Sequence, residues 1–224
     1  MFVGHFAVGF VAKRMAPRIS LGTTVLASLL PDLLWSIFLI AGIEHVRFRP
    51  GVGAANYLDA SDIALSHSLL TDAVWAAMLA ALYFVWRRYS RGAWVLFLAV
   101  LSHWLLDFAS HRPDMALAPG VDKRFGLGLW TSIPATVVVE GGFWLIAIIL
   151  YVRATRPRNR WGIYAFWPVV ALLTLAWYNN IAGPPPPSPS SVGISSLIFF
   201  SAALTWAYWM DRIRPARSLS ASQG

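Results

Sequence analysis

The sequence predicts an all-α membrane protein: a polytopic helix bundle with six spanning helices and a short membrane-inserted helix at the N-terminus. Of its 224 residues, 58% are hydrophobic and only 12% are charged, and the mean hydropathy is +0.59. Several apolar runs approach the roughly 20 residues that a helix needs to cross the hydrocarbon core. These runs are expected to be helical because backbone groups find no water to bond in lipid.

The positions of these runs define six spans and one shorter segment. The first apolar segment, 2–12, is too short to cross the membrane alone. The six spans are predicted at residues 21–43, 63–86, 93–110, 133–152, 162–181 and 193–210. Ser61 has the side chain and the position to cap the second span, and Pro113 is expected to end the third span near His111.

The net charge of +8 is carried by basic clusters that flank the spans. The densest clusters are Lys13/Arg14/Arg18, Arg87/Arg88/Arg91, Arg153/Arg156/Arg158/Arg160 and Arg212/Arg214/Arg217. The positive-inside rule places these clusters, and so both ends of the six-span unit, in the cytoplasm. This arrangement suits anionic lipid headgroups and topology signals, so nucleic-acid binding is not expected. The chain has no Cys, which excludes thiolate metal sites and disulfides.

Seven ionisable residues interrupt the apolar segments: His5, Asp32, His67, Asp72, His103, Asp107 and Glu140. An ionisable group in lipid is costly and needs a partner. No Lys or Arg is expected at the same depth, so either the acids are protonated or bound cations supply the missing positive charge. His, Asp and Glu are good ligands for divalent metals. At the rise of an α-helix, four of the seven lie about 18 to 24 Å from the basic cluster at their helix end. These four are Asp32, His103, Asp107 and Glu140.

The third span carries the sharpest pattern. His103, Asp107 and His111 are spaced i, i+4 and i+8, which places them along one helix face. Three such ligands can hold one or two metal ions, whereas a single His–Asp pair at this spacing is more often a hydrogen-bonded pair. His67 lies between two Ser residues and is either a ligand or a hydrogen-bonded interface residue. Asp72, five residues further on, is expected to support the site rather than bind metal.

The order of these residues resembles that of the membrane-bound metal-dependent hydrolase family of bacteria and archaea, whose members include a LexA-regulated inner-membrane group. The resemblance covers residues 1–145. The family is in turn similar in ligand order to the soluble zinc-dependent phospholipases C. It implies a hydrolase in the cytoplasmic (inner) membrane with a di- or tri-zinc site. The ligands that it implies are His5, Asp32, His67, His103, Asp107, His111 and Glu140.

We therefore expect an integral-membrane hydrolase of phosphoesters in lipid or lipid-linked substrates, with its site near the outer leaflet. Two or three divalent ions, Zn²⁺ or another divalent metal, would activate water. Asp32 and Glu140 are the expected catalytic residues, and Arg112 is expected to bind the substrate phosphate. Pro31 is expected to kink the first span and tip Asp32 into a cavity. Glu44 is interpreted as a loop residue.

Two other functions remain open on the sequence alone. The same polar core would suit a proton- or metal-coupled transporter, or an inactive scaffold that keeps a metal for stability. The chain is divided into a metal-site helical membrane core, 1–153, and a C-terminal helix pair of the same membrane domain with a basic cytoplasmic tail, 154–224. The sequence assigns no chemistry to this second part.

Overall fold

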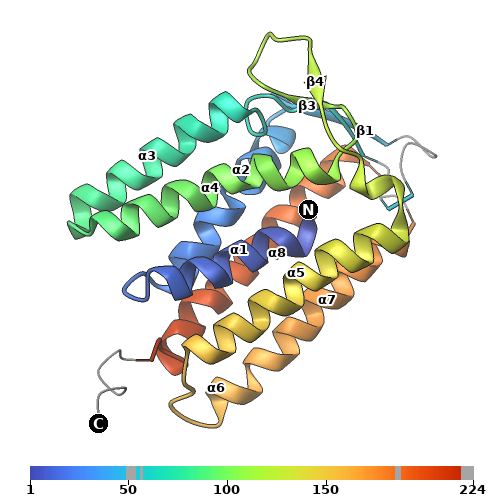
Figure 1. Ribbon diagram of the computed structural model, residues 1–224. Helices are drawn as coiled ribbons and strands as arrows, with labels where there is room; N and C mark the ends of the chain where they lie inside the picture. Colours follow the sequence, from blue (N-terminus) through green and yellow to red (C-terminus); the bar gives the residue numbers. More distant parts are fainter. Residues whose placement is uncertain (49–53, 56–57, 185–187, 218–224) are drawn as a thin grey trace.

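The computed structural model describes residues 1–48, 54–55, 58–184 and 188–217, and the described part is almost entirely helical. Six of its helices are long and apolar enough to cross a membrane, counting α6 and α7 as one, so the predicted fold class is confirmed. The N-terminal helix α1 is shorter (Figure 1). The helices are α1 (Phe2–Met15), α2 (Leu21–Ile40), α3 (Leu69–Arg87), α4 (Ser90–Ser110), α5 (Ile133–Ala154), α6 (Trp161–Tyr164), α7 (Phe166–Ala182) and α8 (Pro189–Ile213).

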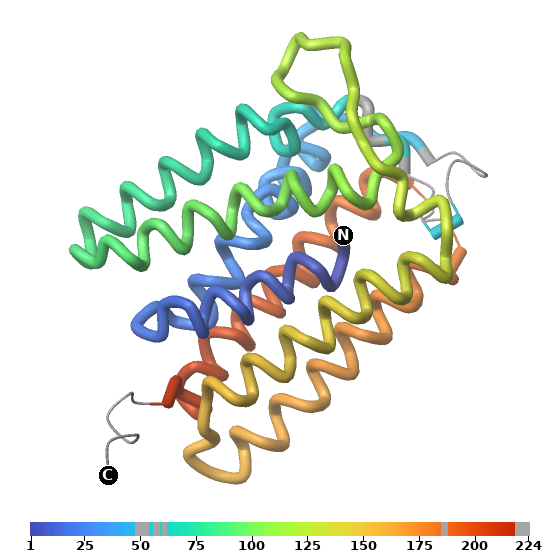
Figure 2. Tube along the Cα trace, viewed as in Figure 1, coloured from blue at the N-terminus to red at the C-terminus, as the bar shows by residue number. Residues whose placement is uncertain are grey.

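The short helix α1 lies in the middle of the bundle. It packs against α2, α4 and α5, while α2 also packs along α8 and α3 forms a hairpin with α4 (Figures 1 and 2). Surrounding helices bury most of α1, which explains how a segment too short to span alone remains within an apolar bundle.

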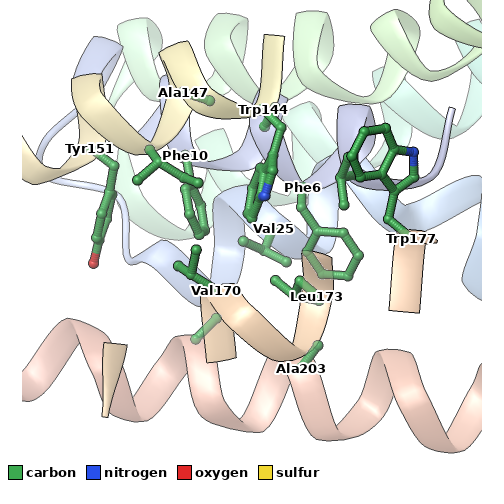
Figure 3. Close-up of a cluster of buried hydrophobic side chains, with 14 of the residues drawn as sticks. Phe6, Phe10, Val25, Trp144, Ala147, Tyr151, Val170, Leu173, Trp177 and Ala203 are labelled. Carbon is green, nitrogen blue, oxygen red and sulfur yellow. The ribbon is translucent and has the colours of Figure 1, made fainter. Parts of the chain in front are cut away.

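The largest apolar core joins the two ends of the chain. Phe6 and Phe10 of α1 pack with side chains of α5, α7 and α8 (Figure 3). The ring centroid of Phe10 lies 4.8 Å from that of Tyr151 and 5.3 Å from that of Trp144. The last two spans therefore share one core with α1, α2 and α5. Large apolar side chains such as Leu82 and Val138 face outward, as in a helix bundle surrounded by lipid.

Two small antiparallel hairpins, which the sequence did not predict, lie at one end of the bundle. β1 (His45–Phe48) pairs with β2 (Leu58–Asp62), and β3 (Met115–Ala116) pairs with β4 (Arg124–Phe125). A 3₁₀ turn, η1 (Leu129–Thr131), precedes α5. This end is opposite α6 and the C-terminal end of α8 (Figure 1).

The second span begins later than predicted. Ser61 lies in β2, and the cap of α3 is Ser68, whose hydroxyl accepts from the Thr71 amide while the Thr71 side chain accepts from the Ser68 amide. Residues 63–68 form turns instead of a helix. The prediction of a Ser61 cap is therefore wrong, because a better capping box lies seven residues further on.

The end of the third span is confirmed, and it changes the position of His111. Helix α4 ends at Ser110, and His111 has the extended dihedral angles φ −70° and ψ 151°. A residue so close to Pro113 is easily drawn out of the helical region. His111 therefore leaves the helix face that carries His103 and Asp107, and the prediction of three ligands along one face is wrong.

Lys13 is buried at the end of the bundle away from the hairpins, and it ties α1 to α8. Its ammonium lies 2.6 Å from Asp211 Oδ1 and donates to the carbonyls of Ile19 (2.6 Å) and Pro17 (3.1 Å). Replacing Lys13 with Met is expected to lower the free energy of unfolding by about 2–4 kcal/mol, because Asp211 loses its cationic partner and keeps only the Leu21 amide. Denaturant unfolding in detergent measures this effect.

The matched control for this change is Arg14→Met, which removes an exposed charge from the next position of α1. It is expected to change stability by less than about 0.5 kcal/mol. Equal losses in the two variants would show that the buried ion pair contributes nothing particular to the fold.

Candidate metal centre

Four side chains from three different parts of the chain converge near the N-terminus of α1. Asp32 lies on α2, His67 in the turn before α3, and His103 and Asp107 one turn apart on α4. His103 Nε2 lies 3.2 Å from His67 Nε2, 3.4 Å from Asp107 Oδ2 and 3.7 Å from Asp32 Oδ1. His67 Nε2 lies 3.5 Å from Asp32 Oδ1 and 3.8 Å from Asp107 Oδ2.

These separations fit the ligands of one small divalent ion. Tetrahedral Zn²⁺ with bonds of about 2.0–2.1 Å separates its ligand atoms by roughly 3.3–3.4 Å. Five separations among these atoms, 3.2–3.8 Å, bracket that value. The closest ligand atoms form two groups that share His103, one with Asp32 and His67 and the other with His5 and Asp107. Two imidazole nitrogens and two carboxylate oxygens are a set that zinc binds well.

His5 extends this group on the side of α1. Its Nε2 lies 3.1 Å from Asp107 Oδ1, and its ring stacks on His103 with centroids 3.6 Å apart. The Met1 amine contacts His5 Nε2 (3.1 Å), Asp107 Oδ1 and Ser110 Oγ (3.2 Å). Asp107 thus faces His5 with one oxygen and the two other imidazoles with its second. A carboxylate placed in this way can bridge two adjacent ions.

A hydrogen bond to the second ring nitrogen orients His103. Its Nδ1 lies 2.9 Å from the carbonyl oxygen of Ser28, an acceptor only, so Nδ1 carries the proton and the Nε2 lone pair faces the centre. Pro31 lies inside α2 and has no amide hydrogen, so the helix lacks one backbone hydrogen bond in the turn that precedes Asp32. Asp32 itself lines the cavity, as the sequence predicted.

A second chain of contacts orients His67. Its Nδ1 lies 2.7 Å from Ser66 Oγ, and that hydroxyl donates to Glu44 Oε2 at 2.6 Å. Glu44 Oε1 accepts from the backbone amides of Leu65 and Ser66, both at 2.8 Å. Because the Ser66 hydroxyl donates its proton to Glu44, its oxygen can accept the proton on His67 Nδ1. This again leaves His67 Nε2 unprotonated toward the centre.

Little in the sequence alone indicates this support for His67. Glu44 is only 3% exposed although it follows an apolar span and was interpreted as a loop residue. The pair of Ser residues around His67 was the one available signal, since short hydroxyl side chains readily bond to neighbouring groups.

The centre is rich in negative charge. Within the described part of the chain, no Lys or Arg side chain contacts Asp32 or Asp107, and the Met1 amine forms an ion pair with Asp107 alone of these two. Burial alone would lower the pKa of His67, but the contact with Asp32 and the charge of Asp107 outweigh burial and raise that pKa above its usual value. Positive charge is therefore favoured at this position, and a divalent cation would supply it.

A cavity of about 220 Å³ opens beside these groups. His5, Asp32, His67 and Asp107 line it on one side. Trp35 of α2 and Trp130 of η1 line it as well, and α7 and α8 contribute Asn179, Asn180, Ser196 and Phe200. The last two spans thus help to enclose the cavity, although they carry none of the candidate ligands. Of the described residues along its wall, none is Lys or Arg.

The other predicted site residues lie outside the ligand groups. His111 lines the cavity, but its Nδ1 lies 3.0 Å from Asp114 Oδ1. Glu140 is fully buried on α5, where one oxygen accepts from the Gly4 amide at 3.2 Å, and it is not part of the cavity wall. Asp72 is buried in the first turn of α3. None of the three shares a group of close ligand atoms with the four converging residues.

Arg112 does not occupy the position predicted for a phosphate-binding residue. Its guanidinium lies 3.1 Å from Asp59 Oδ1 and 3.3 Å from Asp114 Oδ2, and it does not line the cavity. Two carboxylates already neutralise its charge outside the cavity wall, so Arg112 is not placed to bind a phosphate in the cavity.

A family model described as YdjM inner membrane protein matches residues 1–182. No curated protein and no solved structure matches the chain. The matched description names neither a hydrolase nor a zinc phospholipase C, so identification with the metal-dependent hydrolase family was wrong. The matched segment contains every candidate ligand and ends before α8.

Proposed function

We propose that this multi-pass protein, which belongs to the YdjM inner membrane protein family, is a metal-dependent hydrolase. Its proposed substrates are phosphoesters in lipids or lipid-linked molecules. One observation carries the proposal: ligand atoms of Asp32, His67 and His103 converge beside a cavity at separations that suit a divalent ion, and Asp107 lies next to them. Structural metal sites are usually closed, whereas catalytic sites keep a position open to substrate.

The residues around the centre suit hydrolysis. A bound divalent ion such as Zn²⁺ lowers the pKa of water and neutralises charge that develops on phosphoryl oxygen. Asp32 lines the cavity and its side chain is 19% exposed, so it can hold the proton that an attacking water gives up. His5 and Asp107 can hold a second ion next to the first. Glu140 is fully buried and does not line the cavity, so we do not assign it the role of base.

The substrate class follows from the place of the cavity and its walls. The cavity lies at the hairpin end of the spanning helices, and Phe2, Trp35, Trp130 and Phe200 give it apolar sides. Since no basic residue of the described wall is available for the phosphate, its charge would be balanced by metal. A cavity with apolar walls and a bound metal cation suits a phosphate group that is attached to a lipid.

A transporter is less well supported. A transported ion needs a polar route through the bundle, and a polar residue inside a membrane usually marks such a route. Beyond the centre, α1 instead presents Val3, Phe6 and Phe10 to a close-packed apolar core (Figure 3). This packing favours a site that is reached from one side.

The test combines elemental analysis with metal removal. Purified protein is expected to contain one or two equivalents of a divalent metal and to hydrolyse bis-p-nitrophenyl phosphate or a phospholipid headgroup ester. Dialysis against a chelator is expected to abolish hydrolysis, and added Zn²⁺ to restore it. Metal flux across proteoliposomes without hydrolysis would instead support transport, and protein that binds no metal would overturn the proposal.

A further inference from the structure

A second pocket lies at the opposite end of the bundle, where the connection between α1 and α2 meets the turn between α3 and α4. Its volume is about 150 Å³, and its lining residues are Arg18, Tyr83, Trp86, Arg87 and Tyr89. Two of these five are cationic, three are aromatic and none is acidic. The pocket shares no residue with the candidate metal centre.

The backbone fixes the aromatic side of this pocket. Arg88 has a positive φ of 50°, which ends α3 and lets the chain reverse within two residues. Gly92 on α4 then allows close approach, because a Cβ there would lie 2.5 Å from the Tyr89 ring and 2.9 Å from the Tyr83 ring. Both tyrosine rings therefore lie against α4.

Aromatic rings, not carboxylates, hold the two arginines. The Arg18 guanidinium lies 4.5 Å from the centre of the Tyr89 ring, and that of Arg87 lies 5.1 Å from the Trp86 ring. The Tyr83 hydroxyl interacts electrostatically with both. In the described part of the chain neither arginine forms an ion pair with Asp or Glu. Their N–H donors thus remain available to an anion.

We propose that this pocket binds the phosphate of an anionic phospholipid headgroup. Arginine matches phosphate oxygens with paired N–H donors, and an anion between two guanidiniums relieves their mutual repulsion. Leu82, Val85 and Trp86 on the adjoining turn of α3 are 67%, 64% and 77% exposed. These side chains offer an apolar path for acyl chains next to the pocket, which favours a lipid over free phosphate. A Trp at the end of a spanning helix also lies at headgroup depth.

The test measures thermal unfolding of the full-length protein in nanodiscs of phosphatidylcholine, with or without phosphatidylglycerol. Phosphatidylglycerol is expected to raise the Tm of the wild-type protein by about 3 °C or more. The double variant Arg18→Gln/Arg87→Gln is expected to lose this gain while it unfolds normally in phosphatidylcholine alone.

The control variant is Arg153→Gln/Arg156→Gln, which removes the same charge from exposed positions outside the pocket. It is expected to keep the full gain. Equal loss in both double variants would overturn the proposal in favour of diffuse surface attraction. An equal gain from inorganic phosphate in neutral nanodiscs would overturn the lipid as ligand, and no gain from phosphatidylglycerol in the wild-type protein would overturn the site itself.

Discussion

Replacing His103 with Ala is expected to remove the bound metal and to reduce hydrolysis below detection. His103 is fully buried and belongs to both groups of close ligand atoms, the one with His5 and Asp107 and the one with Asp32 and His67. Its loss would therefore weaken both ion positions, and the two neighbouring imidazoles, His5 and His67, already belong to one group each. Elemental analysis and turnover of the purified variant measure the two effects together.

Two further variants separate loss of metal from loss of fold. His103→Gln fills most of the vacated space but offers a poorer ligand, so it is expected to unfold near the wild-type temperature and still lack metal. His45→Ala removes an exposed imidazole from β1, far from α4 in the chain, and is expected to keep full metal content and activity. Wild-type metal content in His103→Ala would contradict the assignment of the centre.

The fold could be predicted where one physical constraint dominates. Apolar run length fixes the spans because lipid leaves the backbone no alternative to helix. The start of α3 was missed because Ile63, Ala64 and Leu65 extend the apolar run, whereas hydrogen bonds of Ser66 and Ser68 organise a turn. The two hairpins were missed because their strands are short and carry no alternating pattern.

The sequence predicts how deep in the membrane the site residues lie, but only partly which way their side chains point. The constant rise of a helix places Asp32, Asp107 and Glu140 at similar depths. Depth does not specify which neighbour a side chain faces, and Glu140 faces the Gly4 amide instead of the cavity. Support from Glu44 depends on how a loop folds back over 22 residues to Ser66, and no local pattern encodes that contact.

Removing the Ser66 hydroxyl is expected to weaken metal binding by roughly 10- to 100-fold, the usual effect of losing a group that orients a metal-binding His. Ser66→Ala leaves His67 in place but frees its ring to rotate or to carry its proton on Nε2, the atom that faces the centre. Glu44→Gln is expected to act in the same direction, because an amide nitrogen turned toward Ser66 cannot accept the hydroxyl proton. Competition with a chelator of known affinity measures the change without reference to activity.

The control for this prediction is Ser102→Ala, which also removes a hydroxyl next to a candidate ligand. Ser102 donates to the Ala99 carbonyl at 2.8 Å within α4 and bonds to no imidazole of the described residues, so its loss is expected to leave metal affinity unchanged. Ser66→Thr keeps a hydroxyl and is expected to recover most of the affinity. If Ser66→Ala bound metal as tightly as the wild-type protein, Glu44 and Ser66 would merely shape the turn before α3, and the direction of the His67 lone pair would have to be set by Asp32 alone.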